Sequence, residues 1–326
     1  MVAAETTDIV EEARRRHGLS PTATAALGRA MTGALLLAQL LLKTPKERIT
    51  LRVEGTGPLG GLVVEADAFG HVRGYVNNPR AEVPLGEDGK LNVGALVGAG
   101  ALRVDRSLPS GEVYTSTVPL VSGEIAEDLA HYLWQSEQIP SAVLLGVRVK
   151  GEGEVEVAGG VAVQVMPGAK EEVLGRLEAN LKDLPGLTPL LRERGLEGAL
   201  EALLAGLGFE RTDLRALGYF QNEIPARFRC RCNREKALEA LVFFTPEERE
   251  EMIVKEGGAE VVCHWCGEVY RFSPEEVRSL VAEVRCPDCG ALWLYPKGDG
   301  TLARIEGETC RCGRKVELPS ETRPQA

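Results

Sequence analysis

The chain has 326 residues, of which 44% are hydrophobic and 26% are charged, and its net charge at pH 7 is −10. This length and composition predict one large globular domain with one or two smaller ones. Nucleic-acid-binding proteins usually carry a basic surface. Here even residues 225–326 hold 16 Lys and Arg against 18 Asp and Glu, which argues against DNA or RNA as the main partner.

Targeting signals and cysteine usage predict a cytoplasmic protein without membrane association. Met1 is followed by a short polar stretch, which does not resemble a signal peptide. The most apolar segment, residues 25–42, contains Arg29 and is shorter than the about 20 apolar residues of a membrane span, so we interpret it as a buried helix. All eight cysteines follow position 229 in close pairs, a pattern typical of metal binding or redox chemistry in a cytosolic chain.

The first half of the chain predicts an α+β core domain over residues 1–166. Helices are expected at 6–18 and 20–42, the second with Ser20 as N-cap and Pro21 as its first residue. One further helix is expected at 122–137. Short β-branched segments predict strands at 49–54, 62–66, 72–76, 102–108, 113–118, 143–150 and 154–166. Helices first and strands afterwards indicate a mixed helix and antiparallel-sheet domain, not a repeating βαβ unit.

Residues 167–224 predict a helical linker of low intrinsic stability. Leucines recur at helical spacing, but several glycines interrupt them, and each interior Gly costs up to about 1 kcal/mol relative to Ala. Short amphipathic helices gain most of their stability by packing on another element. We therefore expect this linker to be folded only while it is docked.

A small zinc-binding domain is predicted over residues 225–284. Helices are expected at 237–244, 246–255 and 274–284, and strands at 259–262 and 268–272. Two close cysteine pairs are separated by thirty residues. Four thiolates complete the tetrahedral coordination of Zn²⁺ and leave no open position for a substrate. The predicted ligands are Cys230, Cys232, Cys263 and Cys266. His264 could replace one cysteine, but four cysteines already complete the site, so we interpret His264 as a surface residue.

Residues 285–326 form a second cysteine-rich segment that resembles a zinc ribbon. Its two pairs lie twenty residues apart, with strands expected at 292–295 and 303–306. The second candidate zinc site consists of Cys286, Cys289, Cys310 and Cys312. Two alternatives stay open at this point, a second set of redox-active pairs and a partner-binding module.

Four separated segments follow one another in the order of a known family: SPTATAALGRA (20–30), EGTGPLGGLVVEAD (54–67), VPLVSGEIAEDLAHYLWQSEQIPSAVLLGV (118–147) and CRC…VVCHWCGEVYRF (230–272). By these segments, about residues 5–285 resemble the 33-kDa heat-shock protein family of bacterial redox-regulated holdase chaperones. Two features depart from the family. The chain starts about a dozen residues late, so an edge of the core domain could be missing, and it continues beyond the usual family end near residue 285.

This resemblance implies an ATP-independent stress-response chaperone that is not an enzyme. When reduced and zinc-bound, family members are poor chaperones. Hypochlorous acid, or peroxide with unfolding stress, forms disulfides and releases zinc, and the implied pairs here are Cys230–Cys232 and Cys263–Cys266. The zinc domain and linker then unfold and hold unfolding client proteins, often as a homodimer.

Three alternatives remain from the residues alone. Most four-cysteine sites are permanent structural sites, so the first centre could lack any switch. The second cysteine set would also suit a zinc-ribbon regulatory or nucleic-acid-binding protein, although the acidic charge argues against it. Cys263 and Cys266 could serve a thiol oxidoreductase, but such pairs usually begin a helix near a βαβ unit, and here two short strands flank the pair.

Overall fold

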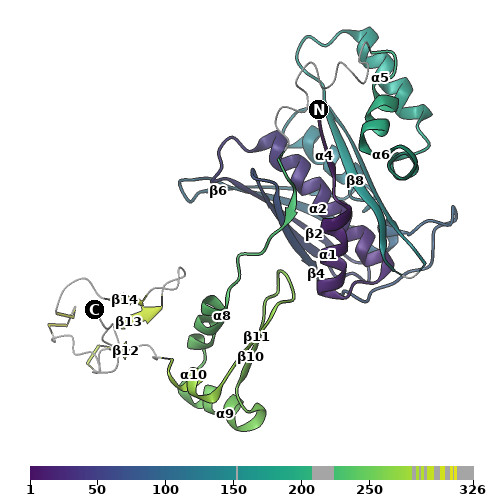
Figure 1. The fold of residues 1–326 in the computed structure, drawn as a ribbon. Helices are drawn as coiled ribbons and strands as arrows, with labels where there is room; N and C mark the ends of the chain where they lie inside the picture. Colours follow the sequence, from purple (N-terminus) through teal and green to yellow (C-terminus); the bar gives the residue numbers. More distant parts are fainter. Residues whose placement is uncertain are drawn as a thin grey trace. The chain divides into compact units, whose positions relative to one another are not determined.

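The computed structural model describes residues 1–151, 153–207, 224–280, 284–285, 288–289, 292–296, 302–304, 309–310 and 312–313. The chain divides into two compact units, Met1–Cys230 and Arg231–Ala326. Figure 1 shows the elements of both units along the chain. The predicted α+β class is confirmed, because the sheets are antiparallel apart from one parallel pair. The four-domain division of the sequence stays a prediction.

Two helices near the N-terminus form the centre of the first unit. Helix α1 spans Thr7–His17 and α2 spans Pro21–Leu41. The Ser20 hydroxyl accepts a hydrogen bond from the Ala23 amide, so the predicted N-cap is confirmed. Helix α2 is long and apolar enough to cross a membrane, but 83% of its most apolar 18-residue window is buried inside the protein. It is the core helix that the sequence predicts.

The larger sheet has the strand order β6-β5-β2-β3-β4-β9 and packs against α2. Five of its strands follow the predicted segments closely, and the two-residue β9 was not predicted. Helix α3 (Val93–Val97) lies in the connection that precedes β5. The strands are β2 (Arg48–Gly55), β3 (Leu62–Asp67), β4 (His71–Val76), β5 (Gly100–Ser107), β6 (Val113–Pro119) and β9 (Arg227–Phe228).

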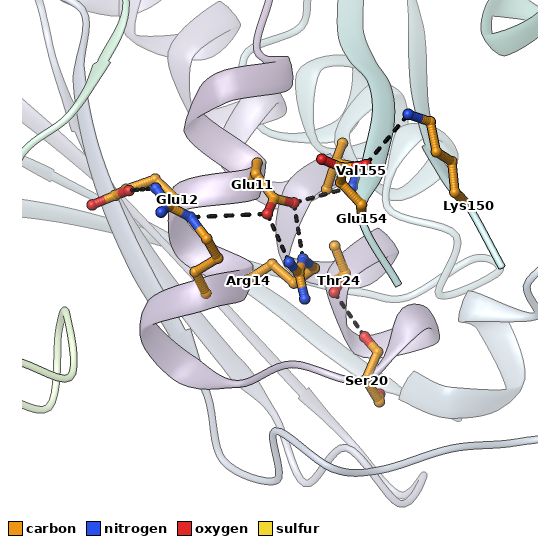
Figure 2. Close-up of polar contacts among 9 residues, drawn as sticks. Glu11, Glu12, Arg14, Ser20, Thr24, Lys150, Glu154 and Val155 are labelled. Atoms are coloured by element: carbon orange, nitrogen blue, oxygen red, sulfur yellow. Dashed lines mark hydrogen bonds and ion pairs between the residues drawn. The ribbon is translucent and has the colours of Figure 1, made fainter. Parts of the chain in front are cut away.

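A three-stranded sheet, in the order β1-β8-β7, covers another side of α2. Strands β7 (Ser141–Val149) and β8 (Val155–Gln164) match the prediction, whereas β1 (Val2–Glu5) was not predicted. Helix α1 is tied to this sheet by Glu11, whose carboxylate accepts hydrogen bonds from Arg14 and from the Val155 amide at 3.0 Å. Figure 2 shows Glu11 between these two donors.

Helix α4 is shorter than predicted, running from Ala126 to Gln135 instead of from residue 122. The Asp128 carboxylate is buried and accepts hydrogen bonds from four backbone amides. These donors lie at positions 121, 122, 123 and 125. The four bonds hold the preceding segment as a loop, so the helix begins only after Ile125, whose φ is 73°.

The linker region contains α5 (Glu171–Asp183) and α6 (Leu187–Leu203). Gly195, with φ 66° and ψ −174°, interrupts α6, in line with the predicted breaks. Helix α6 packs on β7, β8 and β1, and its apolar contact with the sheet forms a cluster separate from the main core. The buried members of this cluster are Val157, Val161, Leu187, Leu190, Leu191, Ala199, Leu200 and Leu203.

The second unit begins with short helices and a hairpin around the cysteines. The helix that the sequence predicts over 274–284 is shorter in the structure, where α10 spans Pro274–Arg278. Val284 and Arg285 form strand β12, which pairs with β13. The other predicted elements are confirmed, with small shifts. They are α8 (Arg234–Ala240), η1 (Leu241–Phe243), α9 (Pro246–Glu256), β10 (Ala259–Val262), β11 (Val269–Phe272), β13 (Leu292–Pro296) and β14 (Leu302–Arg304).

Candidate metal centre

A tight turn between β10 and β11 presents Cys263 and Cys266. The Cys263 amide donates to the Glu268 carbonyl, and the Cys263 carbonyl accepts from the amides of Cys266 and Gly267. Gly267 has a φ of 70°, which favours glycine because a side chain is disfavoured there. The turn therefore brings both thiols to the end of the hairpin.

The other pair lies in the short connection between β9 and α8. Cys230 follows Phe228 by two residues, and Cys232 directly precedes Asn233, the N-cap of α8. The Asn233 side chain accepts a hydrogen bond from the Lys236 amide, which fixes the start of that helix. The first pair is thus held between an edge strand and a capped helix.

The four sulfur atoms come together in one group. Every pair among the Sγ atoms of Cys230, Cys232, Cys263 and Cys266 lies within 4.8 Å, and Cys232 and Cys266 are 3.4 Å apart. A tetrahedral zinc with Zn–S bonds of about 2.3 Å requires sulfur–sulfur separations of about 3.8 Å. The donor set and its spacing therefore fit one zinc ion. Assignment of these residues as ligands stays a prediction.

Two donors from outside the cysteine motifs reach the first pair. An Arg73 guanidinium nitrogen (Nη1) donates to Cys230 Sγ over 3.6 Å, and the Tyr270 hydroxyl donates to Cys232 Sγ over 3.2 Å. The hydrogen bond to Cys232 raises the pKa of Tyr270 above its ordinary value, so the phenol stays protonated as a donor. Outer hydrogen bonds of this kind orient metal ligands and stabilise thiolates.

A small apolar core supports the hairpin and its helices. It contains Ala237, Leu241, Ile253, Ala259, Phe272 and Val277. Among the described residues only four of these buried side chains are larger than alanine, and the Arg234 guanidinium lies 4.5 Å from the centre of the Phe272 ring. A core of this size supplies little stability by itself. Metal coordination would therefore contribute a large part of the stability of this unit.

The second cysteine set is described in part. The Sγ atoms of Cys289, Cys310 and Cys312 lie within 4.8 Å of one another, and those of Cys289 and Cys310 are 3.5 Å apart. Cys310 is buried and Cys312 is exposed. The predicted fourth member, Cys286, lies outside the described residues. Three converging thiols are able to hold a metal ion, as the sequence predicts for this segment.

Sequence reasoning identified the cysteines but missed their neighbours. His264 is exposed and lies outside the group of four thiols, in agreement with its interpretation as a surface residue. Arg73 and Tyr270 carry no motif that marks them, because Arg73 is 157 positions from Cys230 and Tyr270 is 38 positions from Cys232. Only the fold brings these donors to the sulfurs.

The fold and the thiols together define a class of protein: a helix-and-sheet unit followed by a small cysteine centre able to hold a metal ion. A family model described as Hsp33 protein matches residues 1–273. The chain belongs to the Hsp33 family, which is a family of chaperones.

Named relatives agree with this membership. A 33 kDa chaperonin of Thermus thermophilus is 99% identical over the whole chain, which covers 96% of that protein. The 33 kDa chaperonin of Deinococcus radiodurans is 52% identical over 86% of this chain and 93% of its own length. A crystal structure of the 33 kDa chaperonin of Thermotoga maritima has a TM-score of 0.72 and 43% identity, covering 84% of this chain and 90% of that one.

Proposed function

We propose that this chaperone is a redox-regulated, ATP-independent holdase. Its reduced form would hold one zinc ion on Cys230, Cys232, Cys263 and Cys266 and bind clients poorly. Oxidation would join Cys230 to Cys232 and Cys263 to Cys266 and release the metal. The observation that carries the proposal is the convergence of these four thiols within 4.8 Å in a unit with a small apolar core.

Zinc, when bound, supplies the positive charge that keeps four thiolates together. Binding free energies of about 10–16 kcal/mol are typical for structural zinc in small domains at neutral pH. The core around Phe272 and Val277 is too small to replace a contribution of that size. Loss of the four-sulfur arrangement would therefore unfold this unit.

Hypochlorous acid and hydrogen peroxide can each convert a cysteine pair to a disulfide. Two thiolates, one hypochlorous acid and one proton give a disulfide, chloride and water. With hydrogen peroxide, two thiolates and two protons give a disulfide and two waters. Each pair places a second thiol close to the first, which favours a disulfide over further oxidation of a sulfenic acid. Arg73 and Tyr270 donate to the first pair and stabilise the reactive thiolate form.

The docked α6 would supply an apolar surface for clients. Leu191, Leu200 and Leu203 on this helix are almost fully buried against the three-stranded sheet. The contact is close, since a Cβ at Gly146 would lie 2.6 Å from the Thr188 hydroxyl. Undocking would uncover apolar groups on both the helix and the sheet, and such patches bind other chains.

The remaining parts of the proposal concern partners, location and the second cysteine set. Unfolding proteins in the cytoplasm would be the clients, and the oxidised form would be a homodimer. A second zinc ion would be held by Cys286, Cys289, Cys310 and Cys312. Metal analysis of the reduced full chain should then give two zinc ions, and the Cys310→Ser variant should retain one.

The experiment that tests the proposal follows zinc release and client holding in one oxidation time course. A chromogenic chelator reports zinc, while light scattering reports aggregation of a chemically unfolded reporter enzyme. Both signals should change together in the wild-type chain. A Cys263→Ser, Cys266→Ser variant, which cannot form the second disulfide, separates disulfide formation from metal loss. Full client protection by the reduced, zinc-loaded wild-type protein would refute the redox switch.

A further inference from the structure

Strand β9 is a short addition to the edge of the large sheet. It pairs with β4 through His71 and Val72 only, in the parallel sense, while every other pair in this sheet is antiparallel. Its amides at Arg227 and Arg229 donate to the carbonyls of Gly70 and Val72 at 2.8 and 2.9 Å. A pairing over only two residues of each strand is a small attachment for an edge strand.

The edge of β4 extends beyond its partner. Strand β4 continues to Val76, whereas β9 ends at Phe228, and no further strand pairs with this edge among the described residues. Backbone groups alternate in direction along a strand, so the amide and carbonyl of Gly74 point the same way as those of Val72. Gly70, Val72 and Gly74 are buried while β9 is in place. A strand edge that its partner has left is a template for another extended chain.

One side chain of β9 is seated on the core. Phe228 packs against the main apolar cluster, and the Arg16 guanidinium lies 5.4 Å from the centre of its ring. This arrangement combines backbone hydrogen bonds, which do not depend on sequence, with a binding position for one aromatic side chain. The same combination is used by domains that bind extended peptides by strand addition.

The β9 attachment is directly linked to the cysteine centre. Cys230 follows Phe228 by two residues, and Arg73 of β4 donates to Cys230 Sγ. Next to Cys230, the Arg229 guanidinium donates a hydrogen bond to His71 Nε2 over 3.2 Å. A guanidinium group can only donate, so Nε2 is the acceptor and the ring proton is on Nδ1, which donates to the Asp67 carboxylate. A disulfide at Cys230 carries no negative charge, so Arg73 would lose its charge-assisted contact with this sulfur and keep only its ion pair with Glu65.

We propose that the outer edge of β4 is a binding site for an extended segment of an unfolding polypeptide, and that β9 occupies this site in the reduced protein. The inference rests on the proposed function, in which oxidation of the cysteines frees β9. Clients bind through backbone hydrogen bonds to Gly70 and Val72, the groups that β9 uses, with an aromatic residue preferred beneath Arg16. Backbone recognition suits a chaperone whose clients share no sequence.

Hydrogen–deuterium exchange of residues 70–76 and 227–229 in the full chain tests this inference. The probe is reduced, carboxymethylated α-lactalbumin, a permanently unfolded protein, and its binding is followed by co-elution. The amides of Arg227 and Arg229, which donate to this edge, should exchange about tenfold faster on oxidation, as β9 leaves, and exchange within 70–76 should slow when the probe binds. Slow exchange of the Arg227 and Arg229 amides after oxidation would overturn the inference, because β9 would still be in place.

The other outcomes separate this inference from the proposed function. Co-elution of the probe with exchange at 70–76 still fast would place the client elsewhere, which overturns the β4 site and leaves the holdase intact. Failure of co-elution in both redox states would overturn both proposals.

Two matched variants test the attachment of β9 without oxidation. Arg227→Pro removes the amide that donates to Gly70, whereas Arg227→Ala removes only the side chain. In the reduced protein, exchange of the Arg229 amide should rise about tenfold in R227P and stay at the wild-type rate in R227A. Equal exchange in the two variants would overturn the assignment of this edge to backbone pairing.

Discussion

Arg73 and Cys230 lie 157 positions apart in the sequence, yet the Arg73 guanidinium donates to Cys230 Sγ over 3.6 Å. Arg73 also forms an ion pair with Glu65 on the neighbouring strand, at 3.1 Å. The side chains of both residues are largely buried. The larger sheet therefore contacts one of the four thiols directly, so a change at this sulfur alters a contact of strand β4.

Replacement of Arg73 should weaken zinc retention in the reduced protein. Donors to metal ligands typically affect metal affinity by about 10–100-fold, so Arg73→Ala should release zinc to a chromogenic chelator about tenfold faster than the wild type. Glu65→Gln is the matched control, because it weakens the same ion pair but leaves the contact between Arg73 and Cys230. Equal release rates in wild type and R73A would contradict a role for this contact.

A charged side chain on the buried face of α6 should activate the chaperone without oxidant. Leu200 is 2% exposed, and loss of a buried leucine typically costs about 2–5 kcal/mol, so Leu200→Asp should undock the helix. Light scattering with an unfolded reporter enzyme should show client protection by the reduced variant. Val173→Asp on α5 is the control, since Val173 is 42% exposed. Protection by both variants, or by neither, would argue against α6 as the covering element.

A methyl group at Gly70 should displace the segment that leads to the cysteines. An added Cβ would lie 3.0 Å from both Ile224 Cγ2 and the Pro225 carbonyl. Gly89 has a similar positive φ, 75° against 79°, with nothing within 4 Å of its added Cβ, so Gly89→Ala carries the same backbone strain without the collision. Trypsin should cleave after Arg227 about tenfold faster in G70A than in G89A. Similar rates would show that this segment is not held on Gly70.

Acid should weaken the link between α1 and β8. The hydrogen bond from Arg14 holds the pKa of Glu11 below its ordinary value. A lowered folded-state pKa contributes stability above the unfolded-state pKa, and this stability is lost as the pH falls through the folded-state pKa. Glu11→Gln should therefore lower the Tm by about 2 °C at pH 7, with a smaller difference near pH 4.

Glu12→Gln is the matched control for Glu11. Glu12 pairs with Arg15 and Arg16 on the surface of the same helix, where ion pairs contribute little. Its Tm should stay within about 1 °C of the wild type at both pH values. A pH-independent loss in E11Q would show that the effect comes from packing and not from the carboxylate charge.

Local patterns predicted most of the first unit. The β-branched segments and the cap at Ser20 and Pro21 correspond to observed elements, because these signals lie within a few residues of the structure they determine. The start of α4 was missed because its loop depends on several amides bound by one carboxylate, Asp128, which helical periodicity does not reveal.

The centre was predictable only in its thiols. Cysteine spacing indicated Cys230, Cys232, Cys263 and Cys266, and these sulfurs converge in the structure. The two outer donors and the pairing of β9 with β4 depend on contacts between distant segments. A two-residue strand such as Arg227–Phe228 carries too few residues for any periodicity to be recognised.

The aggregation of a chemically unfolded reporter enzyme, with the protein reduced and zinc-loaded and then after oxidation, tests the central claim most directly. The account predicts strong suppression of light scattering only after oxidation, because bound zinc keeps the reduced protein folded and inactive. Equal suppression in both states would contradict the switch and indicate a client surface that is always exposed. No suppression in either state would contradict the holdase proposal itself.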